Sequence, residues 1–326
     1  MLPTLAELIE TAQVVSLPLV TRFRGIDTRE ALVFQGPFGW TEFSPFVEYD
    51  DAEAAAWLWA AIDFGWNAPP APLRERIIVN ATVPAVGPEQ VSDVLARFPG
   101  CRTAKVKVAN VGQTLADDIA RVRQVRAVLG AEGRIRVDAN GGWNVDEAEH
   151  AIHALAEFDL EYVEQPCATV AELVDIRLRT AYLDIPIAAD ESVRRAEDPL
   201  AVARAGAADL LVIKAQPLGG IRSALAIIAQ TGLPVVVSSA LDTSIGISMG
   251  AHLAAAIPEL QFDCGLGTAS LLAADVTTSP LVPVGGSIPV QRVVPDAGLL
   301  ARHAASADRR AWWLNRLAST YATIAG

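Results

Sequence analysis

Five short apolar runs between positions 105 and 214 each end in charged residues that could bind a metal ion or move a proton. The runs end at Lys105-Val106-Lys107, Val137-Asp138, Val163-Glu164, Ala189-Asp190 and Ile213-Lys214. The intervals from 138 to 164, 164 to 190 and 190 to 214 are 26, 26 and 24 residues. This regular spacing indicates a repeated unit with a polar group at the same end of each copy.

The residue types define the chemistry that such a set would carry. Asp138, Glu164 and Asp190 would repel one another on neighbouring strands unless a cation lay between them. Carboxylate oxygens without a His or Cys partner favour Mg2+ over zinc. Lysines precede and follow the three carboxylates in the chain, and they are placed for proton transfer.

A strand–helix repeat is the element that would position these charges. One such unit takes about 5 residues of strand, 10 to 14 of helix and two short loops, which is roughly 22 to 28 residues. The charges then fall where the strands end, which is the face of a closed (β/α)8 barrel that carries active sites. An open doubly wound sheet has no reason to place charges on five successive units. We therefore expect an α/β protein with a closed barrel.

The alternation of side chains along a strand predicts which way the charges point. Lys105 and Lys107 share one face of their strand, and Arg136 and Asp138 share one face of the next. The apolar residues between them suit packing against outer helices. The charged faces are therefore expected to point into the mouth of the barrel.

Eight barrel strands can be assigned along the chain. They are 77–83, 103–108, a strand ending at Asp138, a strand ending at Glu164, 185–190, 210–214, 234–239 and 260–264. Capping signals begin three of the helices between them, where Thr114 precedes Asp117, Asn144 precedes Glu147 and Thr169 precedes Glu172. Two further helices are expected over 221–231 and 244–256.

The residues before the barrel predict a smaller α+β domain. Strands over 12–19, 29–35 and 39–43 form an antiparallel meander, and a helix follows over 50–66. The proline-rich segment 67–72 breaks the chain. We assign 1–75 to this domain, 76–285 to the barrel, and 286–326 to a tail that packs back on the first domain. The tail carries a last helix over 301–322 with Trp312 and Trp313.

Composition limits the possible partners and the compartment. A net charge of −12 argues against binding nucleic acid or an anionic membrane, but not against an anionic substrate that meets a local metal ion and lysines. Three scattered cysteines fit a reducing compartment. The chain lacks the basic start of a signal peptide and any uncharged apolar run of about 18 residues. A cytoplasmic protein is expected; its oligomeric state is left open.

Together these residues resemble the enolase superfamily in its muconate-lactonising branch. That branch carries Lys-x-Lys on the second barrel strand, single carboxylate metal ligands on the next three, and a lysine on the sixth. Here these are Lys105-Val-Lys107, Asp138, Glu164, Asp190 and Lys214. The resemblance implies a modified (β/α)7β barrel whose mouth is covered by an α+β capping domain.

Within the branch, the segment Ser238–Gly246 and the short chain are similar to the o-succinylbenzoate synthases of menaquinone biosynthesis. The resemblance implies a Mg2+-dependent lyase, with Mn2+ as a possible substitute. Its reaction would be the syn-dehydration of 2-succinyl-6-hydroxy-2,4-cyclohexadiene-1-carboxylate to o-succinylbenzoate. Lys107 would remove the α-proton and protonate the departing hydroxyl, Lys214 would stabilise the anion, and Lys105 would be an auxiliary charge. The division of proton transfer between Lys107 and Lys214 is left open.

The resemblance also implies roles for residues around this centre. Arg136 is expected to contact the substrate or the ligand carboxylates, and Asn140 and Glu191 to support the metal ligands. The backbone amides of Ser238, Ser239 and Gly265 are expected to receive the succinyl carboxylate. The loop 23–28 of the first domain is a candidate lid over the substrate.

Two alternative functions are weighed against the same residues. A racemase of N-acylamino acids or an epimerase of dipeptides would move one proton with Lys107 and another with Lys214. A non-catalytic binding barrel would be expected to have lost a ligand or a lysine, and this chain retains them all.

Overall fold

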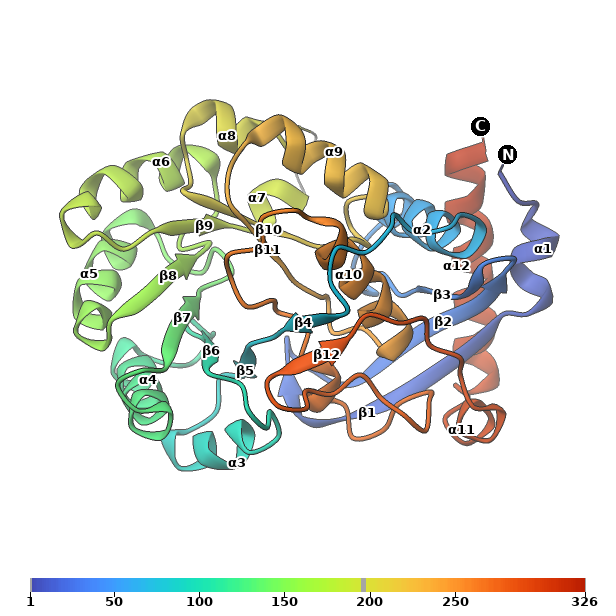
Figure 1. Cartoon of the computed structure of the whole chain (residues 1–326), viewed down its shortest axis with the longest axis horizontal. Helices are drawn as coiled ribbons and strands as arrows, with labels where there is room; N and C mark the ends of the chain where they lie inside the picture. The colour runs from blue at the N-terminus through green and yellow to red at the C-terminus, as the bar shows by residue number, and fades with distance from the viewer. Residues whose placement is uncertain (1, 195–197, 326) are drawn as a thin grey trace.

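The computed structural model describes residues 2–194 and 198–325. They form a barrel with helices on its outside and a smaller lobe, the cap, which contains the N-terminal strands and both ends of the chain (Figure 1). The α/β architecture predicted from the strand–helix repeat is confirmed, because the barrel strands form one parallel sheet that curls on itself.

The cap contains an antiparallel sheet with the order β1-β2-β3. Its elements are α1 (Leu5–Glu10), β1 (Gln13–Phe23), β2 (Ile26–Gly36), β3 (Gly39–Phe43) and α2 (Asp51–Trp66). The loop expected over 23–28 is mostly strand, because Phe23 pairs with Ile26 and only Arg24 and Gly25 make the turn. Both turn residues have positive φ, of 50° and 78°, which a tight hairpin requires.

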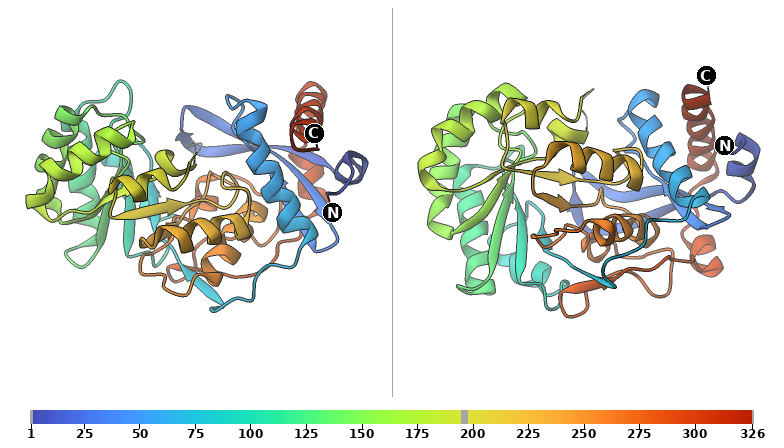
Figure 2. Two further views of the ribbon diagram at one scale, coloured as in Figure 1. Left: turned by 90° about the horizontal axis from the view of Figure 1, so that it is seen from above. Right: turned by 45° about the horizontal axis from the view of Figure 1, so that its top comes forward.

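The C-terminal helix completes the core of the cap. α12 (Ala307–Ala325) lies beside α2 and the cap sheet, as both views of Figure 2 show. Trp313 is fully buried there, meets the edge of Phe43 at a ring-centroid distance of 6.1 Å, and donates a hydrogen bond to Glu30 at 2.9 Å. The expectation that this tryptophan packs against the first domain is confirmed. The last helix itself begins later than expected, after α11 (Ala297–Arg302).

The parallel sheet has the order β11-β10-β9-β8-β7-β6-β5. Its strands are β5 (Ala81–Val83), β6 (Thr103–Lys107), β7 (Arg134–Asp138), β8 (Leu160–Glu164), β9 (Ile187–Ala189), β10 (Leu210–Ile213) and β11 (Val235–Val237). The helices around it are α3 (Val91–Leu95), α4 (Leu115–Leu129), α5 (Val145–Leu155), α6 (Val170–Arg179), α7 (Glu191–Arg194), α8 (Ala201–Ala205), α9 (Ile221–Thr231) and α10 (Ser244–Ala256).

The expected helix starts are present. Capping boxes at Thr114, Asn144 and Thr169 each join a side-chain oxygen to the third amide of the helix and receive a carboxylate in return. Because these pairs satisfy backbone donors that the first helical turn leaves open, they fix where α4, α5 and α6 begin.

The barrel closes through very few residues. Cys264 bridges Val79 on one side and Gly265 bridges Ser238 on the other, both in parallel orientation. In place of the eighth strand expected over 260–264, only two isolated bridge residues, Cys264 and Gly265, pair with their neighbours. The predicted first strand is also divided, since β4 (Arg76–Ile78) pairs with β12 (Ser287–Pro289) outside the barrel and β5 alone enters the sheet.

The register of the sheet places the charged residues side by side. Lys107 pairs with Asp138, and Asp138 pairs with Glu164. Glu164 pairs with Ala188, so that Asp190 lies just beyond the end of β9. No helix in the described part of the chain is long and apolar enough to cross a membrane.

Candidate active site

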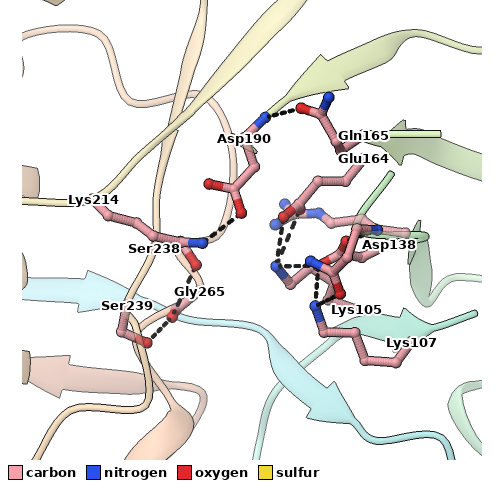
Figure 3. A network of polar contacts seen from close by, with 12 residues as sticks. Lys105, Lys107, Asp138, Glu164, Gln165, Asp190, Lys214, Ser238, Ser239 and Gly265 are labelled. Atoms are coloured by element: carbon pink, nitrogen blue, oxygen red, sulfur yellow. Dashed lines mark hydrogen bonds and ion pairs between the residues drawn. The ribbon is translucent and has the colours of Figure 1, made fainter. Parts of the chain in front are cut away.

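The six charged residues singled out in the sequence meet at the carboxyl ends of the barrel strands (Figure 3). The chain has 26 lysines and arginines, of which only three are lysines. All three of them, Lys105, Lys107 and Lys214, line one small cavity. The sequence has no lysine elsewhere, and this composition was a signal for the site that the spacing of the strands did not supply.

Lys105 and Lys107 bind the carboxylates of the two neighbouring strands. Lys105 Nζ lies 3.1 Å from Asp138 Oδ2 and 2.9 Å from Glu164 Oε1. Lys107 Nζ makes a short contact with the same oxygen of Asp138 and donates to Asn140 Oδ1 at 2.7 Å. The expectation that both lysines face the interior is confirmed by these contacts.

Lys214 reaches the centre from the other side, from the end of β10. Its Nζ lies 2.5 Å from Asp190 Oδ2. Gln165 accepts a hydrogen bond from the Asp190 amide at 2.9 Å and so fixes the backbone at the end of β9. Figure 3 shows Lys214 and Lys107 entering the site from opposite directions.

Burial and mutual charge set the protonation of this group. The carboxylates of Asp138, Glu164 and Asp190 are fully buried. Burial together with the charge of Asp138 raises the pKa of Glu164 to about 8, even though Lys105 opposes that change. Burial disfavours the charged form of Asp190, but Lys214 and Arg194 outweigh it and lower the pKa to about 2.

The two lysines of β6 are shifted in opposite directions. Burial lowers the pKa of Lys107, and the charge of Lys105 adds to this effect while Asp138 opposes it. Lys105 is also buried, but Glu164 and Asp138 together overcome that burial and raise its pKa. Lys107 is therefore the more readily deprotonated of the pair.

Asp138, Glu164 and Asp190 are the candidate oxygen donors for a divalent ion. Within residues 2–194 and 198–325, no three His, Cys, Asp or Glu side chains stand close enough together to hold a metal ion. Lysine ammonium groups instead neutralise Asp138, Glu164 and Asp190. Three buried carboxylates on successive strands supply the hard oxygen donors that Mg2+ takes, so the residue types fit such an ion.

Asn140 and Glu191 belong to a hydrogen-bond network that reaches this centre. The Asn140 amide donates to Asp138 Oδ1 at 3.0 Å, and its side chain donates to Glu191 Oε1 at 3.2 Å. Arg194, which the sequence reasoning missed, donates to Asp190 Oδ1 at 3.1 Å and Glu191 Oε1 at 2.6 Å. It also donates to the hydroxyl of Tyr49 in the cap at 3.0 Å. Its position three residues after Glu191 was the only available signal.

Arg136 is not brought to the cavity. Its guanidinium is fully buried and donates to Glu161 at 2.5 Å, to Asn80 at 3.2 Å and to the carbonyl of Asp263 at 2.7 Å. Because Arg136 precedes Asp138 by two residues on the same face, it lies one layer deeper in the barrel. The expectation that it contacts substrate is replaced by a role in packing the interior.

Two of the three backbone amides expected to receive a carboxylate are already engaged. The Ser238 amide donates to Ile213 at the end of the β10–β11 pair, and the Gly265 amide donates to Val237 where the barrel closes, each at 2.8 Å. Among the described residues, the Ser239 amide has no such acceptor. The Ser239 hydroxyl contacts the Gly265 carbonyl at 2.8 Å and Thr268 at 2.7 Å.

The cap hairpin covers the cavity. Phe23 and Arg24 line both the inner cavity of about 40 Å³ and a wider outer cavity of about 710 Å³, and Lys107 lines both as well. The ring centroid of Phe23 lies 5.7 Å from Lys107 Nζ. The inner cavity also exposes Thr82, a buried residue whose hydroxyl has no partner among the described residues.

Comparison with known proteins identifies matching families. The model for enolase C-terminal domain-like proteins matches residues 89–299, and the model for enolase N-terminal domain-like proteins matches residues 14–65. The o-succinylbenzoate synthase of Mycobacterium ulcerans (strain Agy99) is 55% identical over 319 residues, which cover 98% of this chain and 95% of that protein. The o-succinylbenzoate synthase of Mycolicibacterium smegmatis is 54% identical over 323 residues, covering 99% and 98%.

Solved structures of lower identity share the fold. A muconate lactonizing enzyme from Pseudomonas fluorescens matches with a TM-score of 0.76 and 20% identity, covering 90% of this chain and 98% of that one. The L-Ala-D/L-Glu epimerase from Bacillus subtilis matches with a TM-score of 0.70 and 23% identity, covering 85% and 94%. Both likenesses support a modified barrel with a cap.

Proposed function

Because the chain belongs to the enolase superfamily and shares more than half of its residues with o-succinylbenzoate synthases over nearly its whole length, we propose that Lys107, Lys214 and the three buried carboxylates carry out the synthase reaction. The enzyme is a lyase of menaquinone biosynthesis. It removes water from 2-succinyl-6-hydroxy-2,4-cyclohexadiene-1-carboxylate and releases o-succinylbenzoate. The observation that carries the assignment of residues is the convergence of all three lysines of the chain on one cavity.

Lys107 is the proposed base. Its amine takes the proton from the carbon that bears the substrate carboxylate, and an enediolate forms. The bond between the ring and its hydroxyl then breaks, and the Lys107 ammonium returns the proton to that hydroxyl as water leaves. One lysine serves both steps because the proton and the hydroxyl depart from the same face. The lowered pKa of Lys107 suits this role, since a base must be neutral before it acts.

Lys214 and Lys105 supply positive charge around the anion. Lys214 approaches from the side opposite to Lys107, so that an intermediate held between them has a cation on its second face. Lys105 stays protonated between Asp138 and Glu164, in keeping with its raised pKa. A charge fixed in a buried site stabilises an enediolate more strongly than the same charge in water does.

Asp138, Glu164 and Asp190 are the proposed ligands of a divalent ion, and Mg2+ is the expected one, with Mn2+ as a possible substitute. When bound, such an ion supplies positive charge to the substrate carboxylate and to the developing enediolate. The backbone amide of Asn140 holds Asp138 by a hydrogen bond. Glu191 holds Arg194 by another. Arg194 in turn orients Asp190.

The far end of the substrate is proposed to lie against the carboxyl ends of β11 and the 264–265 segment. The Ser239 amide is the donor proposed for the succinyl carboxylate, because those of Ser238 and Gly265 are used in the sheet. An inner cavity of about 40 Å³ is too small for the substrate. We therefore propose that the hairpin turn at Arg24 and Gly25 moves when substrate enters, which is the lid role expected of this segment.

An assay of the purified protein with Mg2+ tests the proposal. The ultraviolet absorbance of the cyclohexadiene substrate should disappear with the wild type and fall at least about a thousandfold more slowly with Lys107→Ala. Arg123→Ala, which removes an exposed cation of α4 whose side chain is 62% exposed, serves as the matched control and should keep the wild-type rate. Wild-type activity in Lys107→Ala would contradict the assignment of the base.

Racemisation is a second candidate, favoured by the approach of Lys107 and Lys214 from opposite sides. Incubating the enzyme with N-succinylamino acids or dipeptides in D2O and following α-proton exchange by NMR tests it. Exchange that is lost in Lys107→Ala or in Lys214→Ala would support a second activity at the same site.

Net charge and the free cysteines support proposals for the partners and the compartment of the protein. The substrate is a small carboxylate, and no nucleic-acid partner is expected from a chain with a net charge of −12. Cys101, Cys167 and Cys264 are free, which fits the reducing cytoplasm. Fractionation of cells followed by immunoblotting tests the location.

A further inference from the structure

A buried ion pair on α4 lies directly behind the strand that carries Lys107. Arg121 Nη1 donates to Asp118 Oδ1 at 2.8 Å, and the two residues are one helical turn apart. Arg121 is 1% exposed and Asp118 is 2% exposed. Burying two charges is unfavourable unless their other hydrogen-bonding atoms are also satisfied, so the remaining partners of this pair show what it holds.

Those partners are backbone groups on both sides of Val108. Arg121 Nη1 also donates to the carbonyl of Lys107 at 2.8 Å. Asp118 Oδ2 accepts the amide of Ala109 at 2.9 Å. The pair therefore binds two consecutive peptide groups, Lys107–Val108 and Val108–Ala109, at the point where the strand becomes a loop.

The loop needs this support because its backbone is unfavourable at Ala109. That residue has a φ of 57°, in the left-handed region where a side chain other than glycine or asparagine is disfavoured by about 1 kcal/mol or more. The hydrogen bond from Asp118 holds the amide of this residue. Without it, the turn after Lys107 would be free to relax toward an extended conformation.

Arg121 extends the same support to the neighbouring strand. Its Nε donates to the carbonyl of Val86 at 2.6 Å, and its Nη2 donates to Gln113 Oε1 at 2.5 Å. Gln113 in turn donates to the carbonyl of Ala85 at 2.9 Å. One guanidinium thus ties the loop after β5 to the loop after β6.

We infer that the Asp118–Arg121 pair positions Lys107 for proton transfer, an inference that rests on the proposed function of Lys107 as the base. The amine of a lysine stands at the end of a long, flexible chain, so its place relative to substrate depends on where its backbone lies. The side chain is tethered at its tip by Asp138 and Asn140, and the buried pair tethers it at its root. Neither Asp118 nor Arg121 lines the cavity that contains the lysines.

The molecule offers a matched control on the same helix. Arg126 also binds backbone carbonyls, those of Gly130 at 3.0 Å and Phe158 at 2.7 Å, but at the opposite end of α4. Arg121→Lys and Arg126→Lys therefore remove the same kind of interaction near the active site and far from it. Both variants keep the positive charge, and both are expected to lower the melting temperature.

Steady-state kinetics separates positioning from stability. We expect kcat of Arg121→Lys to fall roughly 10- to 100-fold, because a displacement of about 1 Å has an effect of that size on a reacting group. KM should stay within about threefold of the wild-type value, because the pair does not touch the cavity. Arg126→Lys should keep the wild-type kcat at a temperature where both variants are folded. Equal kcat values in the two variants would overturn the inference.

Asp118→Asn is the second variant, should Arg121→Lys not fold. Asparagine is nearly isosteric, but Asp118 accepts from Ala109 and from Arg121 with different oxygens, so the amide nitrogen of asparagine would face one of these donors and that hydrogen bond would be lost. A kcat lower than wild type supports the inference, and an unchanged kcat overturns it. Failure of the proposed function would give a different result: no turnover by the wild type, or full turnover by Lys107→Ala. Either result would overturn the positioning role as well.

Discussion

The carboxylate of Glu42, on β3 of the cap, accepts a hydrogen bond from the backbone amide of Gly246 in the first turn of barrel helix α10 at 3.1 Å. The same oxygen accepts the Thr243 hydroxyl at 2.5 Å. A side chain of one lobe thus caps a helix of the other, where a negative charge is favoured by the helix dipole. Burial and the neighbouring Asp242 nevertheless raise the pKa of Glu42 to about 7.

This shift predicts a pH-dependent stability. A carboxyl group whose pKa is raised in the folded protein stabilises the fold most below its unfolded pKa of 4.5, and that contribution is lost as pH rises through about 7. Glu42→Gln removes the ionisation, so its free energy of unfolding should fall less than that of the wild type between pH 5 and pH 8, by about 2 to 3 kcal/mol. Urea unfolding at several pH values measures this difference, and parallel curves would contradict it.

The space around Gly246 predicts an unequal effect of two alanine substitutions in α10. A Cβ atom at Gly246 would lie 2.6 Å from Asp242 Cβ and 3.0 Å from Glu42 Cδ, whereas at Gly250 it would meet the tip of the flexible Leu266 side chain. Alanine favours a helix by about 1 kcal/mol over glycine. We expect Gly246→Ala to destabilise the protein by about 1 to 3 kcal/mol and Gly250→Ala to change its stability by less than about 1 kcal/mol. Comparison of urea midpoints checks both.

Trp313 should contribute more to stability than another tryptophan of the cap. Trp313→Ala empties a fully buried site and leaves Glu30 without the indole donor, so a loss of about 3 to 5 kcal/mol is expected. Trp59 is 44% exposed, and Trp59→Ala should cost less than about 1.5 kcal/mol. Similar unfolding curves for the two variants would show that α12 is not anchored by Trp313.

Removal of divalent ions should abolish turnover without unfolding the protein. Treatment with EDTA is expected to lower the rate at least about a hundredfold, because the charge that balances the substrate carboxylate is lost. Added Mg2+ should restore the rate, and Mn2+ should do so in part. Far-UV circular dichroism, unchanged by EDTA, is the control. A rate that survives exhaustive chelation would exclude the proposed ligand role of Asp138, Glu164 and Asp190.

Much of the fold and the centre of the site could be predicted from the sequence because two simple periods describe them. The interval of about 26 residues fixed which strands are neighbours, and the alternation along β6 and β7 fixed that Lys107 and Asp138 face the same interior. Capping residues such as Thr114 marked where helices begin. These are local rules, and the parallel register then brings the charged ends together.

The remaining features depend on depth and on contacts between distant segments. The side chains of Arg136 and Asp138 point to the same face of β7. The alternation of side chains therefore could not show that Arg136 lies in the packed interior and Asp138 at the mouth of the barrel. The Ser238 amide is used in the β10–β11 pair and the Gly265 amide in the closure of the barrel, which the sequence of 260–264 did not reveal. Likewise, Asp118 and Arg121 look like ordinary charged residues of an amphipathic helix, and only the packed structure shows that both are buried.

The completion of the cap by α12 has a consequence for synthesis on the ribosome. Strands β1–β3 are translated before the barrel, but Trp313, which fills their core, belongs to α12 and is translated after the barrel. The whole barrel is therefore made between the two halves of one hydrophobic core. A nascent chain must carry an incomplete cap sheet until α12 has been translated, so this lobe stays without its full core throughout synthesis of the barrel.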